Sequence, residues 1–302
     1  MIPAQLAIAR FRRDVTVGRL LNVILIAIVF FCVLLGSAFT SGLADVVLLV
    51  IVFVVWLTLG YHSLRSQRLA AGSPSLIAAG QFDLAEDQIE QALRAFSLFR
   101  TSKLLSLHHL AVLRHAQRRW GEAAELSHAL LRTRLGNLRG LSRQSRLILA
   151  ESLLEMGDVR GAYQAIAALY TQRLTLAEAL NLLNVQLDYN WRVNAWDAML
   201  EGAATRAQLA ELMNTFNAAR SQALMALAAK RLGRQDWQSW LARRAELLVE
   251  PRALVANRPI LAELWPEAGA VDPNTTSPAA AATDAPPTLG AGDSSDETTH
   301  AN

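Results

Sequence analysis

The chain has 302 residues and a formal net charge of +3, and 52% of its residues are hydrophobic whereas only 18% are charged. That balance is more apolar than is usual for a purely soluble domain. The single cysteine, Cys32, excludes an internal disulfide and any cysteine-rich zinc or iron–sulfur site. The basic residues are nearly all arginine and are scattered along the chain, so the sequence predicts no nucleic-acid partner.

Residues 1–19 form a basic N-terminal segment, and two apolar runs over residues 20–40 and 46–61 follow it. Because about 20 consecutive apolar residues cross a hydrocarbon core as a helix, the runs predict a two-helix transmembrane hairpin over residues 20–62. A cleaved signal peptide and a pair of buried core helices are the alternative interpretations.

The charges around the two runs predict an orientation. Four arginines precede the first run, Arg65 and Arg68 follow the second, and the connecting turn carries only Asp45. The positive-inside rule then places both termini and the rest of the chain in the cytoplasm, in an integral protein of the inner or plasma membrane. The runs contain no acid or base that would mark a transport path, so the hairpin is interpreted as an anchor.

The segment 63–265 is predicted to be helical throughout. No proline occurs between Pro74 and Pro251, and alanine, leucine, arginine, glutamine and glutamate dominate. Turn signals that divide this segment into helices of roughly 12 to 20 residues occur at Gly80, at Arg119 to Gly121, at Gly136 to Gly140, at Gly157 and Asp158, at Asn190 to Asn194, and at Gly233.

Three of these turns are similar to one another. Residues 82–85, 120–123 and 159–162 each have a large apolar residue followed three positions later by alanine. The stretches 80–93 and 157–169 resemble the turn and second helix of a tetratricopeptide repeat, and 119–132 resembles them without the glycine. The spacing is longer than the usual 34 residues of that family, and its closing proline is absent. The resemblance therefore implies an irregular, tetratricopeptide-like α-solenoid.

A solenoid of this kind presents a concave groove to its partners. When the copies are aligned with the family's pattern, the resemblance implies which side chains point into the groove. They are those of His108, Val112, His115, Gln144, Leu147, Glu151 and Glu155. The Lys, Arg and Asn set with which some members of the family hold a peptide carboxylate is missing. A helix or a weakly basic peptide is the ligand that this composition favours.

Other candidate chemistry is sparse. His108, His109, His115 and His128 are the only cluster that could bind a metal, but no cysteine or suitably spaced acid completes a site. Glu151 and Glu155 are one helical turn apart, which is ordinary spacing for a solvated face. No nucleotide-binding or hydrolase motif occurs, so the sequence predicts neither an enzyme nor a cofactor or metal.

The complete prediction is an all-α protein with a transmembrane hairpin, a tetratricopeptide-like solenoid over 63–265, and a disordered acidic tail over 266–302 rich in proline, alanine and threonine. The layout resembles bacterial membrane proteins that carry cytoplasmic tetratricopeptide repeats. We predict a membrane-anchored scaffold or adaptor that binds proteins of the cytoplasm or the membrane. The alternatives are a structural subunit of a larger membrane complex and a metal-dependent sensor or enzyme that uses the histidines.

Overall fold

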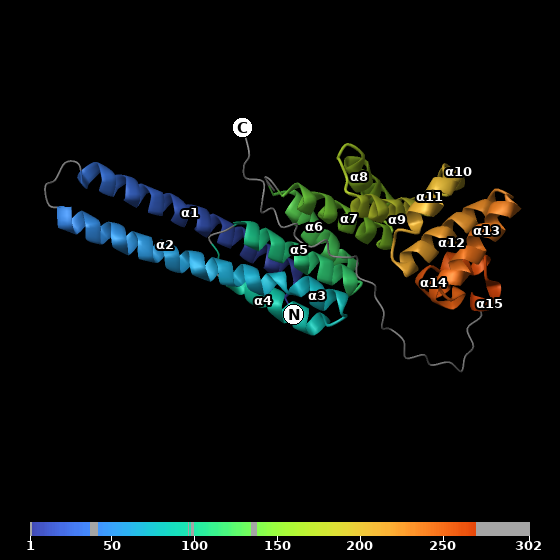
Figure 1. Ribbon diagram of the computed structural model, residues 1–302, viewed down its shortest axis with the longest axis horizontal. Coiled ribbons are helices and arrows are strands. Elements are labelled where there is room, and N and C mark those ends of the chain that lie inside the picture. Colours follow the sequence, from blue (N-terminus) through green and yellow to red (C-terminus); the bar gives the residue numbers. More distant parts are fainter. Residues whose placement is uncertain (1, 37–41, 96, 98–99, 134–137, 270–302) are drawn as a thin grey trace, which may run out of the picture.

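The computed structural model describes residues 2–36, 42–95, 97, 100–133 and 138–269, and within these residues the regular elements are all helices. The predicted all-α character is therefore confirmed. Two long helices, α1 (Ala4–Gly36) and α2 (Gly42–Ala71), lie side by side and extend away from a body formed by the other helices (Figure 1).

The helices of the body follow α2 in chain order. They are α3 (Ser73–Ala78), α4 (Phe82–Arg94), α5 (Arg100–Ala116), α6 (Trp120–Leu131), α7 (Arg139–Glu155), α8 (Val159–Tyr170), α9 (Leu176–Arg192), α10 (Trp196–Leu200), α11 (Ala203–Ala210), α12 (Thr215–Arg231), α13 (Gln235–Leu248), α14 (Pro251–Asn257), the 3₁₀ helix η1 (Pro259–Glu263) and α15 (Pro266–Gly269). The predicted disordered tail lies, from residue 270 onward, outside the described residues.

Five turns between these helices share one geometry. Each contains a residue with a φ angle between 56° and 80°, at Gly80, Arg118, Gly157, Asn194 and Gly233. The amide of that residue donates to the carbonyl three positions earlier, and the next amide donates to the carbonyl five positions before itself. These paired bonds are the Schellman motif, which satisfies the last carbonyls of a helix. The five positions are 37 to 39 residues apart, so one helix-ending device recurs at nearly constant spacing.

The first turn lies between α3 and α4, and the other four separate a row of leading helices, α5, α7, α9 and α12, from the helix that follows each of them. Within this leading row α5 packs on α7, α7 on α9, and α9 on α12. Side-chain hydrogen bonds cross between neighbouring leading helices at residues 35 to 37 positions apart, as in His108 with Ser145, Arg143 with Glu178, and Asn184 with Ser221. This packing is consistent with a helical repeat.

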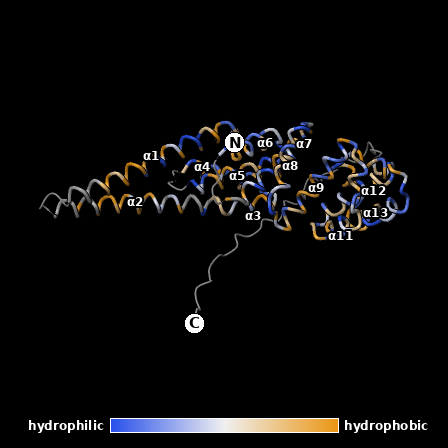
Figure 2. The backbone as a smooth tube through the Cα atoms, turned by 90° about the horizontal axis from the view of Figure 1, so that it is seen from above, coloured by the Kyte–Doolittle hydropathy of each residue, from blue (hydrophilic) through white to orange (hydrophobic). Residues whose placement is uncertain are grey.

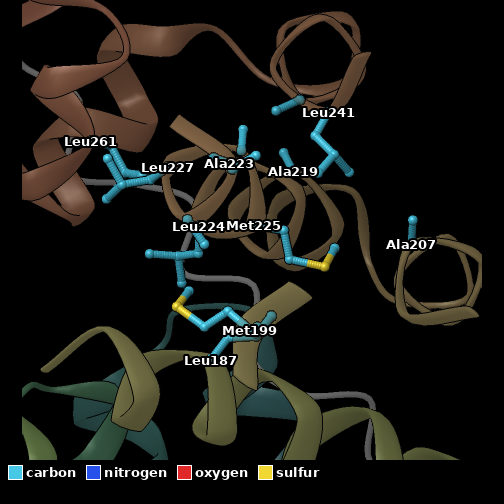
Figure 3. Packing of buried hydrophobic residues seen from close by; sticks show 14 of the residues in the cluster. Leu187, Met199, Ala207, Ala219, Ala223, Leu224, Met225, Leu227, Leu241 and Leu261 are labelled. Atoms are coloured by element: carbon cyan, nitrogen blue, oxygen red, sulfur yellow. The ribbon is translucent and has the colours of Figure 1, made fainter. Parts of the chain in front are cut away.

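The core of the C-terminal half is centred on α12. Residues 218–229 of this helix are buried without exception, which is expected of a helix covered on all sides. Figure 3 shows Leu187 and Met199 on one side of α12 and Leu241 and Leu261 on the other.

Thr175 and Glu178 begin the preceding leading helix, α9, with a reciprocal capping box.

The first turns of α1 belong to the core of the body. Ile2, Ala7 and Phe11 are buried in the cluster that α5 and α6 also supply. The fully buried guanidinium of Arg114, on α5, donates to both carboxylate oxygens of Glu86 at 2.8 and 3.1 Å and to the Ile2 carbonyl at 2.9 Å. Residues 2–19, predicted as a basic segment, therefore begin α1 and pack on the helical body.

A second buried cation fastens α1 further along. Lys103 is 1% exposed, and its ammonium nitrogen lies 2.9 Å from the Asp14 carboxylate and donates to the Leu93 carbonyl at 2.7 Å. Burial lowers the pKa of Lys103, although Asp14 opposes that shift. One side chain thus joins α1 to the C-terminal end of α4.

The predicted transmembrane hairpin over 20–62, and with it the predicted two-span integral membrane localisation, is contradicted. Among the described residues, none of the helices combines the length and the apolar character that a membrane crossing requires. The first apolar run, 20–40, continues past the end of α1 at Gly36 into residues outside the described ones, and the second, 46–61, is shorter than the roughly 20 residues that a span needs. Figure 2 shows the apolar residues that prompted the prediction along α1 and α2.

Candidate functional site

The seven residues predicted to face a groove lie on two neighbouring leading helices. His108, Val112 and His115 are on α5, and the other four are on α7, against which α5 packs. His108 and Leu147 are buried, whereas the other five are partly exposed. The structure therefore brings the predicted residues to one helix pair but leaves only some of them accessible.

The two buried histidines are structural. His108 Nδ1 lies 3.2 Å from the Ser145 hydroxyl, and His109 Nδ1 lies 2.9 Å from the Ser73 hydroxyl and 3.0 Å from the Ala70 carbonyl. Burial and the neighbouring His109 lower the pKa of His108 to about 3, and burial also lowers the pKa of His109. Both rings are therefore uncharged at neutral pH and join adjacent helices by hydrogen bonds.

His115 differs because its partner is an acid. Its Nε2 lies 3.1 Å from the Glu151 carboxylate, and the two side chains are 20% and 26% exposed. The His115 and Trp120 rings form a T-shaped pair, with 5.0 Å between centroids and 76° between planes. The pair is thus fixed in position by α5, α6 and α7 and still reaches solvent.

A line of charged side chains continues from this pair across the leading row. Arg192, on α9, donates to Glu155 at 3.2 Å, and Arg258, which follows α14, contacts Glu155 at 2.7 Å. Arg258 also holds Asp188 through two hydrogen bonds of 3.1 and 2.9 Å, and Arg220 of α12 lies 3.7 Å from Asp188. We call this set the charged seam; it consists of His115, Glu151, Glu155, Asp188, Arg192, Arg220 and Arg258.

The charges of the seam stabilise one another. Burial alone would raise the pKa of Glu151, but His115, Arg220 and Arg258 outweigh it and lower the pKa to about 2. The same two arginines lower the pKa of Asp188 against the effect of burial. Burial disfavours the charged form of Arg258, but Asp188 and Glu155 raise its pKa overall. Glu151, Asp188 and Arg258 are consequently ionised together near neutral pH.

The seam contains equal numbers of acids and arginines, and three of its members, Asp188, Arg220 and Arg258, are buried. Three carboxylates are matched by three guanidinium groups, so its charges are balanced. No group of three His, Cys, Asp or Glu side chains able to hold a metal is present among the described residues. The four histidines considered as metal ligands do not converge, because His128 lies on α6 beside α1 whereas His115 pairs with α7.

Four of the seam residues were not predicted from the sequence: Asp188, Arg192, Arg220 and Arg258. Asp188 and Arg192 lie 37 positions after Glu151 and Glu155, so extending the repeat spacing to α9 would have found them. The last turn of α9 contains Trp191, and the Arg192 guanidinium lies over its ring, 4.8 Å from the centroid. Arg258 lies 70 positions from Asp188 and carries no sequence signal of the contact.

Two hollows lie away from the seam. One is between α1, α6 and α7, and its lining residues include Ile8, Arg12, Ala124, Arg132 and Leu153. The other is a cleft between α11 and α13 that contains Trp237 and Trp240.

Comparisons with known proteins identify no relative of this chain. A scan of protein-family models, a search of curated proteins and a search of solved structures each give no match to this chain.

Proposed function

We propose that this protein is a binding scaffold whose leading row of helices receives a segment of a partner protein along the charged seam. The observation that carries the proposal is the accessible part of the seam. His115, Glu151, Glu155 and Arg192, on α5, α7 and α9, are partly exposed and are held in place by contacts within the chain, whereas the other three members are buried. Preorganised charges of both signs suit the recognition of a partner with a complementary pattern, because electrostatic matching supplies specificity and register.

The proposal includes a tetratricopeptide-like solenoid as the architecture that presents this surface. The recurrence of the Schellman turn every 37 to 39 residues supports it, as do the bonds between leading helices at 35 to 37 residues. A stack of similar helix pairs leaves one face of each pair available along its whole length. A partner helix or extended segment is the ligand that such a face would accommodate.

A matched pair of substitutions tests the surface. Gln144, on α7, is partly exposed in the leading row, and Gln164, on α8, is exposed in the following row. Gln144→Lys and Gln164→Lys place the same charge on the two rows of one helix pair. Each variant of the full chain is used as bait in cells of the source organism, and the captured proteins are quantified by mass spectrometry.

Partners that bind along the seam are expected to be lost from the Gln144→Lys bait and kept by the Gln164→Lys bait. Circular dichroism and thermal unfolding establish that both variants remain folded. Equal capture by the two variants, or a loss with Gln164→Lys alone, would place the binding surface elsewhere and overturn the proposal.

A further inference from the structure

The cleft between α11 and α13 combines exposed aromatic rings with acids. Trp237 and Trp240 are three positions apart on α13 and form its aromatic wall, with their centroids 5.6 Å apart and their planes at 88°. Ala204, Gln208 and Glu211 line the opposite wall, and the cleft has a volume of about 610 Å³. Trp240 is 43% exposed, which is unusual for so large an aromatic side chain.

An arginine of the chain already shows what the aromatic wall accommodates. The Arg244 guanidinium lies over the Trp240 ring at 4.7 Å from its centroid and forms an ion pair with Glu211. A planar cation stacked on indole and paired with a carboxylate is a favourable arrangement, because the ring quadrupole and the acid both attract it. Arg244 thereby neutralises one of the two acids of the cleft.

The second acid of the cleft, Asp236, is not neutralised in this way. It lies in the first turn of α13 beside Trp237 and is exposed. No ion pair of its carboxylate occurs among the described residues, whereas Glu211 is paired. The cleft therefore carries one uncompensated negative charge next to an aromatic ring, on a chain whose overall charge is positive.

We propose that the cleft binds an arginine side chain of a partner polypeptide. The incoming guanidinium pairs with Asp236 and stacks against the indole rings of Trp237 and Trp240, as Arg244 stacks and pairs with Glu211 at the other end. Tryptophan and arginine are the residues that most often dominate binding energy at protein interfaces. This site uses none of the seam residues, so it stands or falls independently of the proposed function.

Calorimetric titration of the full chain with a hexa-arginine peptide tests the site, and Asp197 supplies the control. Asp197 is also exposed, lies in the first turn of α10 and follows a tryptophan, but it is not in the cleft. Asp236→Asn should weaken binding about tenfold, as expected for the loss of a charge-assisted contact, whereas Asp197→Asn should leave it unchanged. Trp240→Leu should weaken binding to a similar degree.

Releasing the internal guanidinium gives a second measurement. Arg244→Gln frees Glu211, so this variant should bind the peptide at least as tightly as the unmodified chain. Equal weakening by Asp236→Asn and Asp197→Asn would mean general charge attraction and would overturn the proposal. Undetectable binding to the unmodified chain, or weaker binding to Arg244→Gln, would overturn it as well.

Discussion

The recurring Schellman turn leads to two predictions about stability, one of a more stable variant and one of a less stable variant. At Arg118 a side-chain-bearing residue adopts the left-handed conformation, with φ 58°, whereas at Gly157 a glycine adopts the same conformation, with φ 80°. Arg118→Gly should therefore stabilise the protein, and Gly157→Ala should destabilise it. Asn194→Gly should change stability least, because asparagine tolerates this conformation better than most residues.

The expected magnitude follows from two opposing effects. A residue with a Cβ atom loses ~1–2 kcal/mol in the left-handed region. Glycine avoids this cost, but it makes the unfolded chain more flexible, which lowers the free energy of unfolding by about 0.5–1 kcal/mol. A Cβ added at Gly157 would meet no atom within 4 Å beyond its chain neighbours, so clashes with the rest of the protein add nothing to this difference. The net effect is about 0.5–1 kcal/mol in the free energy of unfolding, upward for Arg118→Gly and downward for Gly157→Ala.

Urea unfolding followed by circular dichroism measures these differences as shifts of the midpoint at constant slope. The Arg118 side chain is exposed, so its removal uncovers no core surface. A lower midpoint for Arg118→Gly, or equal shifts of the same sign in the two variants, would refute the view that these turns are equivalent helix-ending devices.

Three further predictions concern charged side chains that are paired within the chain. Asp188→Asn removes one of the two carboxylates that pair with the buried Arg258 and leaves only Glu155, so it should reduce the free energy of unfolding by about 1–3 kcal/mol in urea titrations. The lowered pKa of Glu151, from 4.5 to about 2, means that its contribution is present above pH 4.5 and is lost as the pH falls toward 2. Glu151→Gln should therefore flatten the loss of stability over that pH range, and an unchanged pH profile would contradict the assignment. Lys103→Met and Asp14→Asn, combined in a double-mutant cycle, should give a coupling energy of roughly 1–3 kcal/mol, and a value near zero would show that α1 is held by other contacts.

The sequence predicts the local structure of the body well. Composition and the absence of proline predict the helices, and the glycines at 80, 157 and 233 mark three of the five equivalent turns. The other two carry Arg118 and Asn194 at the same position. Turn signals were predicted near both, but the left-handed conformation was not, because a hydrogen-bonded helix end can impose it on a residue that does not favour it.

Contacts between distant parts of the chain could not be predicted in the same way. Ile2, Ala7 and Phe11 belong to a segment that was interpreted as basic because of Arg10, Arg12, Arg13 and Arg19, so its entry into the core was not predicted. Arg258 joins the seam through the path of α14, which only the packed structure determines.

The seam also bears on how tightly the proposed partner could be held. A flexible charged surface loses side-chain entropy on binding, about 0.5–1.5 kcal/mol for each long side chain that becomes ordered. In the seam, Glu155 is already held by Arg192 and Arg258, and Glu151 by His115. Since the chain has ordered these groups in advance, a partner segment meets fixed charges at positions set by the helix spacing. A partner whose charges follow the same spacing would be bound specifically, and one with the wrong spacing would meet like charges and be rejected.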